Sequence, residues 1–111
     1  MVELLSNNKI SKIENIFDLI NEIEERTSMW IPDKSIESLS NLLFGYLTCL
    51  KIHDVIEKNV PDFNSFSDWL RQEFDWNLVY GWAYAIKMNC LDPEDPLKKF
   101  FSLVKLFCQS N

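Results

Sequence analysis

Apolar side chains recur at intervals of three and four residues along most of this chain, in segments separated by prolines. Such intervals place the apolar residues on one face of an α-helix, whereas a half-buried strand alternates at every second residue. Pro32, Pro61, Pro93 and Pro96 stand at the edges of these segments rather than inside them. The chain contains only two glycines, whereas tight β-hairpin turns usually need glycine at positions of positive φ. The pattern therefore predicts an all-α fold.

Five segments carry the helical period, and each has the length of a helix in a globular protein. They run over residues 10–23, from Asp33 or Ser35 to Leu50, over residues 63–74, over about residues 78–90, and from Pro96 to Phe107. In the fourth segment the apolar stripe consists of Val79, Trp82, Ile86 and Cys90. The expected architecture is a single compact bundle of about five amphipathic helices with short connections.

Polar residues at the ends of these segments provide candidate helix caps. Asn8 or Ser11 would cap the first segment, and Ser11 with Glu14 fits the capping-box pattern. Asp95, which is followed by a proline, is the expected start of the last segment. Gly45 falls inside the second segment, where glycine costs about 1 kcal/mol relative to alanine. We therefore expect another element to approach Gly45 closely.

Length and composition indicate one helical domain over residues 1–111, with residues 1–7 expected to lack ordered structure. The hydrophobic share of 47% is too high for a disordered chain. The formal net charge is −6, and a surface of that sign repels the phosphates of nucleic acids and anionic lipids. We therefore expect a basic protein as partner, and neither a nucleic acid nor a membrane.

Cys49, Cys90 and Cys108 are far apart and odd in number, which favours reduced, buried thiols over a disulfide framework. The N-terminus lacks the basic region and long apolar run of a signal peptide. No segment has the roughly 18 to 20 apolar residues that are needed to span a bilayer. These features predict a cytoplasmic protein.

No residue pattern in the chain indicates catalysis, and we expect no enzyme, no metal and no cofactor. His53 is the one histidine, and we interpret it as a helix-end imidazole beside the thiol of Cys49. One histidine and three dispersed cysteines do not form a zinc-site pattern, and no glycine-rich phosphate loop occurs. The alternative is a small enzyme in which Cys49 or Cys90 works with His53.

Carboxylates are concentrated on the first helical segment. Glu14, Asp18 and Glu22 follow one another at intervals of four residues, and Glu25 lies close to the same stripe. Like charges at this spacing destabilise a helix by about 0.2–0.5 kcal/mol per pair. The stripe is either an ordinary solvated helix face or a surface kept anionic for a cationic partner.

Aromatic side chains are candidates for anchoring a partner, because Trp and Tyr dominate the hot spots of protein interfaces. Trp69 and Trp82 fit apolar stripes, so we expect them to pack against the core. Trp76 and Tyr84 fit their stripes less well. They are therefore the expected exposed aromatic residues.

The segment from Arg26 to Tyr46 has an ordered pattern beyond its helical period. Its pattern residues are Arg26, Met29, Trp30 and Ile31, followed by Ser35, Ile36, Leu39, Leu42, Leu43, Gly45 and Tyr46. The pattern continues in the second half of the chain with Phe63, Phe66, Trp69, Leu70, Gly81, Trp82, Ile86, Leu97, Phe100, Phe101 and Leu103. This order resembles a widespread family of small bacterial proteins that look like the immunity partners of polymorphic or contact-dependent growth-inhibition toxins. Thr27 and Pro32 depart from it, because they stand where the family usually has Pro and Gly.

The resemblance implies an immunity protein that binds and neutralises one cognate toxin domain. Toxins of this kind are often nucleases, whose basic grooves an acidic inhibitor complements. The expected toxin-binding residues are Glu14, Asp18, Glu22, Glu25 and Trp76. The alternative function is a regulatory adaptor that binds another cytoplasmic protein and has no toxin partner. The toxin's chemistry (RNase, DNase or NAD-consuming), the mode of inhibition (plugging the active site or binding beside it) and the oligomeric state stay open.

Overall fold

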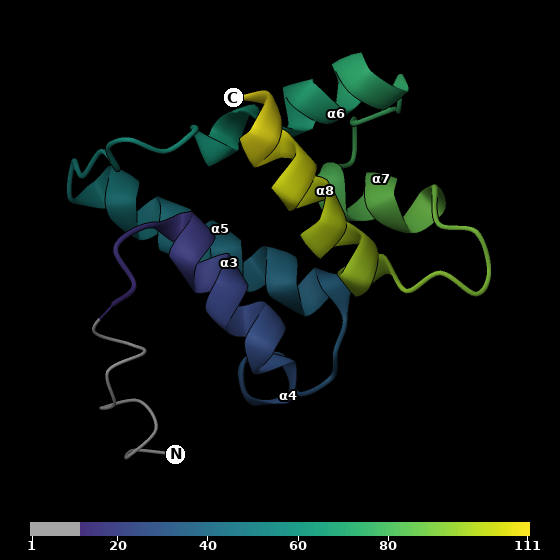
Figure 1. The fold of residues 1–111 in the computed structure, drawn as a ribbon, viewed down its shortest axis with the longest axis horizontal. Coiled ribbons are helices and arrows are strands. Elements are labelled where there is room, and N and C mark those ends of the chain that lie inside the picture. The colour runs from purple at the N-terminus through teal and green to yellow at the C-terminus, as the bar shows by residue number, and fades with distance from the viewer. Residues whose placement is uncertain (1–11) are drawn as a thin grey trace.

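The computed structural model describes residues 12–111, and every regular element in this part of the chain is a helix (Figure 1). The elements are α3 (Ile16–Glu25), α4 (Thr27–Trp30), α5 (Ile36–Ile52), the 3-10 helix η1 (Phe63–Ser65), α6 (Phe66–Phe74), α7 (Trp82–Met88) and α8 (Pro96–Ser110). The predicted all-α bundle of about five helices is confirmed, with α4 as a short additional turn. The prediction for residues 1–7 and the caps proposed at Asn8 and Ser11 lie outside the described residues.

Short polar side chains set where the helices begin. Ser35 caps α5 by accepting a hydrogen bond from the backbone N–H of Ser38 at 3.0 Å, and Asp95 caps α8 by accepting one from Leu97 at 3.1 Å. Both starts agree with the sequence predictions. The first described helix, α3, begins at Ile16, after Ile13 of the predicted stripe. The side chain of Asn15 accepts hydrogen bonds from the first turn of α3 and caps it there.

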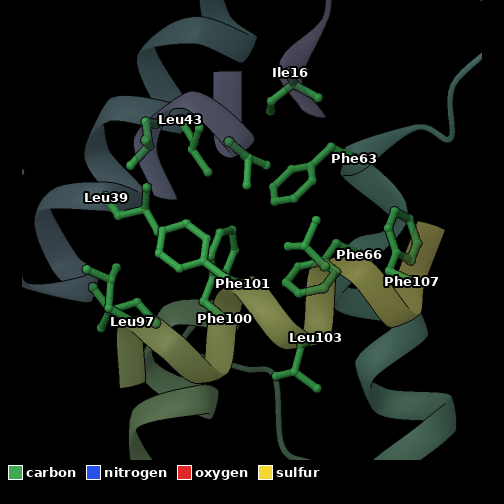
Figure 2. Close-up of a cluster of buried hydrophobic side chains, with 14 of the residues drawn as sticks. Ile16, Leu39, Leu43, Phe63, Phe66, Leu97, Phe100, Phe101, Leu103 and Phe107 are labelled. Carbon is green, nitrogen blue, oxygen red and sulfur yellow. The ribbon is translucent and has the colours of Figure 1, made fainter. Parts of the chain in front are cut away.

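An aromatic cluster forms the centre of the core, with α8 running through the middle of the bundle (Figure 1). Phe66 lies between two rings of α8, with centroid distances of 5.8 Å to Phe100 and 5.5 Å to Phe107. Figure 2 shows these side chains meeting Phe63 and the aliphatic residues that α3 and α5 contribute. Each such aromatic pair contributes about 0.5–1.5 kcal/mol beyond the area it buries. The described helices are therefore held by one shared core.

The fourth helix is shorter than its apolar period predicts. Gly81 has a φ of 91°, which turns the chain immediately before α7. Trp82 and Ile86 pack on the core as expected, but Val79 is exposed. The prediction that Val79 continues the buried stripe is wrong, because the turn at Gly81 separates it from the helix.

Two predictions about buried positions on α5 are wrong. Gly45 is exposed, and a Cβ built there meets no heavy atom within 4 Å, so no element approaches it closely. Cys49, four residues later, is exposed as well, whereas Cys90 and Cys108 are half-buried and all three thiols are free. Both α5 positions lie away from the stripe that this helix buries.

The connection after α5 returns to the start of α3 and is held there by Glu57. The Oε1 atom of Glu57 accepts a hydrogen bond from the backbone N–H of Ile16 at 2.9 Å. Its Oε2 atom accepts one from the hydroxyl of Tyr46. Burial, and then the bond to Glu57, raise the pKa of the Tyr46 phenol. Glu57 therefore satisfies a first-turn N–H group of α3 that no carbonyl of that helix can reach.

Candidate partner-binding surfaces

The predicted acidic residues of the first helix have different surroundings. Glu14 is exposed and lies just before α3. Asp18 is half-buried in the first turn, and its Oδ2 atom accepts a hydrogen bond from the backbone N–H of Glu14 at 3.0 Å. A carboxylate in the first turn also interacts favourably with the helix dipole. Asp18 therefore stabilises the start of α3 whether or not it meets a partner.

Glu22 is only 5% exposed, so it is not part of a solvated face. Its Oε1 atom lies 3.2 Å from Nη1 of Arg26, which follows one turn later and is about one-third exposed. A charge removed from water needs such a partner, because an unpaired buried carboxylate costs several kcal/mol, at a rough estimate. The structure therefore gives Glu22 a role inside the fold and leaves little of it for a toxin to contact.

At the C-terminal end of α3, cations stand beside the carboxylates. Glu25 is exposed, and its Oε2 atom lies 3.7 Å from Nη1 of Arg26. Glu24 accepts a hydrogen bond from Nζ of Lys105 on α8 at 3.2 Å. Of the four predicted carboxylates, Glu14 and Glu25 are exposed and Asp18 is half-buried, whereas Glu22 is withdrawn. The stripe is thus weaker and less continuous than its spacing indicates.

Trp76, the predicted aromatic anchor, is half-buried and lies away from α3. Its ring stacks on Phe74 at a centroid distance of 4.9 Å, and Nζ of Lys99 lies 5.7 Å from the ring centroid. Trp76 belongs to the connection between α6 and α7, which lies across α8 from α3 in Figure 1. The structure does not bring Trp76 together with the acidic residues.

A groove of about 600 Å³ lies between the end of α3, α4 and the start of α8. Charges of both signs line it, among them Glu25, Arg26, Lys34, Asp95 and Lys98. The groove therefore favours no single class of charged ligand.

The segment between α3 and α5 is held in place mainly by packing. Ile31 is buried, and Trp30 packs against the core with a buried Nε1 that has no hydrogen-bond partner in the described structure. The hydroxyl of Thr27 donates to the carbonyl of Ile23 at 2.9 Å. These contacts give Trp30 and Ile31, which helical spacing leaves unexplained, a role in the core.

His53 and Cys49 lie at the exposed C-terminal end of α5, whereas Cys90 follows α7 and Cys108 belongs to α8. His53 ends α5 and is exposed, and its backbone N–H donates to the carbonyl of Cys49 at 3.1 Å. Burial raises the pKa of the Cys90 and Cys108 thiols, which disfavours their thiolates. Within residues 12–111 no cluster of three His, Cys, Asp or Glu side chains is placed to hold a metal ion. No described helix is long and apolar enough to cross a membrane.

The sequence predictions do not include an apolar surface that the structure places on and around α7. We call it the α7 patch, and it consists of Val79, Tyr80, Tyr84, Met88 and Leu91, which are between 48% and 78% exposed. The rings of Tyr80 and Tyr84 contact each other at a centroid distance of 5.3 Å. Tyr84 is exposed as predicted. A signal was present in the sequence, because Tyr80, Tyr84 and Met88 recur every four residues, out of phase with the buried Ile86.

Comparisons with protein-family models, curated proteins and solved structures found no match for this chain. The resemblance carried by residues 26–46 therefore stays a prediction, and proposals about function depend on the surfaces described above.

Proposed function

We propose that this protein is an immunity protein that binds one cognate toxin domain in the cytoplasm of the producing cell and covers its basic substrate cleft. The observation that carries the proposal is the α7 patch, an apolar and partly aromatic surface on a chain whose net charge is −6. Exposed apolar side chains that contact one another, as Tyr80 and Tyr84 do, are typical of sites of protein–protein contact. The contact surface of a partner should therefore be partly apolar and should carry either no charge or positive charge beside its apolar part.

The charge distribution supports a basic partner. The described ion pairs occupy Arg26, Arg71, Lys87, Lys99 and Lys105, each beside a carboxylate. The chain as a whole has 17 carboxylates against 11 Lys and Arg residues, so pairing leaves an anionic excess. Such an excess raises the association rate with a cationic surface and suppresses binding to anionic ones.

A nuclease is the toxin class that this charge favours. Nucleases hold their substrate by its phosphates, so their clefts are lined by Lys and Arg. An acidic protein competes for the same cationic groups. Glu14, Asp18 and Glu25 on the α3 side are the predicted contact residues that retain access to solvent, and they would contribute to steering.

Co-expression with the toxin domain encoded immediately upstream tests this function. We expect restored growth and a copurifying complex of the two chains. A toxin domain that still arrests growth, and that does not copurify with this chain, would contradict the proposal. Copurification with a different cellular protein, together with no toxin gene upstream, would instead support the adaptor function.

Steering by the α3 side is tested with two variants that change the net charge by the same amount. Glu14→Gln removes an exposed anion beside α3, whereas Gln109→Lys adds a cation at the exposed end of α8. At low salt we expect Glu14→Gln to slow association more than Gln109→Lys, with dissociation unchanged, in stopped-flow fluorescence. Equal association rates would show that net charge alone steers the encounter.

A further inference from the structure

α7 is apolar on two opposite sides, although the described chain covers only one of them. Ala85 and Ile86 face the core and are fully buried. Tyr84 and Met88 lie four residues apart on the other side, and the ring of Tyr80 extends their row by contacting Tyr84. Large apolar side chains left exposed beside one another on a helix are typical of a contact surface. The outer side of α7 therefore has the composition of an interface.

The border of the α7 patch is anionic. Residues 75–95, which include α7 and the segments flanking it in Figure 1, contain Asp75, Asp92, Glu94 and Asp95 and one cation of their own. Lys99 of α8 also reaches this segment, where its Nζ lies 3.3 Å from Glu94, so four carboxylates stand against two cations. The cation within the segment, Lys87, donates a 2.6 Å hydrogen bond to a carboxylate oxygen of α5. The patch thus combines an apolar centre with a border that attracts positive charge.

We propose that the α7 patch is the surface that docks the toxin, against a protein face with an apolar centre and a border of Lys and Arg. This inference rests on the proposed function and moves the main contact from α3 to the other side of α8. Tyr and Met are enriched in the buried centres of interfaces, where most binding energy is concentrated. The carboxylates of α3 then contribute to the encounter rather than to the bound contact.

The anionic border argues against a second copy of this chain as the occupant. A symmetric dimer through the α7 patch would bring the same border from both copies together. Like charges placed opposite each other across an interface disfavour the complex. A basic partner has no such cost.

The centre of the patch is tested with the double variant Tyr80→Ser/Tyr84→Ser, titrated with the purified upstream-encoded toxin domain. The control is Ile56→Ser, because Ile56 is 83% exposed and belongs to the connection after α5, at the opposite end of the molecule in Figure 1. We expect the tyrosine variant to bind about 30-fold more weakly or worse, mainly through faster dissociation. The control should remain within about two-fold of the wild type, and urea unfolding should show both variants folded.

The border is tested with Asp75→Asn/Asp92→Asn, which removes two charges and keeps the side-chain shapes. Asn also suits the left-handed backbone of residue 75, whose φ is 58°. We expect slower association at low salt and a smaller difference from the wild type at high salt. An unchanged association rate at low salt would overturn the charge complementarity on which the choice of a basic partner depends.

The possible results separate this inference from the proposed function. If the wild-type protein does not bind the toxin domain, both fail. If the wild type binds and Tyr80→Ser/Tyr84→Ser binds equally well, only the α7 assignment fails. Sedimentation equilibrium of the free protein provides a further check, because a dimer that these substitutions dissociate would make a second copy the occupant and overturn the inference.

Discussion

Removing the Glu57 carboxylate should destabilise the fold more than its half-buried position indicates. The side chain joins three parts of the chain, because it accepts hydrogen bonds from the backbone of Ile16 and from the hydroxyl of Tyr46. The substitution Glu57→Ala leaves both donors without this acceptor. Ile16 is fully buried as a residue, so its N–H group is poorly placed to find water instead.

Hydrogen bonds to charged groups contribute about 1.5–3 kcal/mol each, and solvent around a half-buried carboxylate lowers that figure. We therefore expect Glu57→Ala to lower the free energy of unfolding by about 2–3 kcal/mol, for the two bonds together. Glu57→Gln should cost about 1 kcal/mol, because its amide oxygen can still accept from Ile16. Tyr46→Phe should cost about 1 kcal/mol alone and less than about 0.5 kcal/mol when added to Glu57→Ala.

Urea unfolding followed by circular dichroism measures these changes. With a slope of about 1.5 kcal/mol per molar urea, Glu57→Ala should lower the midpoint by about 1.3–2 M. Gln109→Ala, an exposed position on α8, is the control and should change stability by less than about 0.5 kcal/mol. A Glu57→Ala protein as stable as this control would refute the reasoning and show that water replaces the carboxylate at the start of α3.

Three further predictions concern α5 and the thiols. Gly45→Ala should stabilise the protein by about 0.5–1 kcal/mol in the same unfolding assay, because the new methyl group meets nothing and the unfolded chain loses freedom. Stability should fall as the pH rises from about 10, the ordinary pKa of tyrosine, toward the raised pKa of Tyr46, because the folded state needs the protonated phenol. Tyr46→Phe should flatten that decline. At neutral pH, Cys49 should react with a thiol reagent before Cys90 and Cys108, as mass spectrometry of the labelled peptides would show, because burial raises the pKa of the latter two and restricts access to them.

Local features were predictable from the sequence because the interacting atoms are close along the chain. Ser35 and Asp95 cap their helices through N–H groups two or three residues away, so short-range patterns identify them. The apolar stripes of α5 and α8 follow from the same local geometry. The start of α3 after its cap, Asn15, was not predicted. The apolar spacing extends to residues before Asn15, whereas the helical hydrogen bonds begin only after it.

The candidate site was less predictable, because exposure depends on the other elements. A spacing of four residues placed Glu22 with Glu14 and Asp18, but only the packed structure shows that Glu22 is buried against Arg26. The arginine four residues later was a local hint of that pair. Helical periodicity shows that α7 has two apolar sides but does not show which of them packs against α8. The exposed side could therefore not be predicted from the sequence.

The bond between Ile16 and Glu57 has a consequence for how the chain opens and closes. The two residues are 41 positions apart, so the start of α3 cannot gain this acceptor until the chain has been synthesised past α5. In the folded protein the same bond makes the first turn of α3 and the connection after α5 a single cooperative unit for local unfolding. Amide hydrogen exchange at Ile16 would therefore report the opening of the connection after α5, although Ile16 itself belongs to α3.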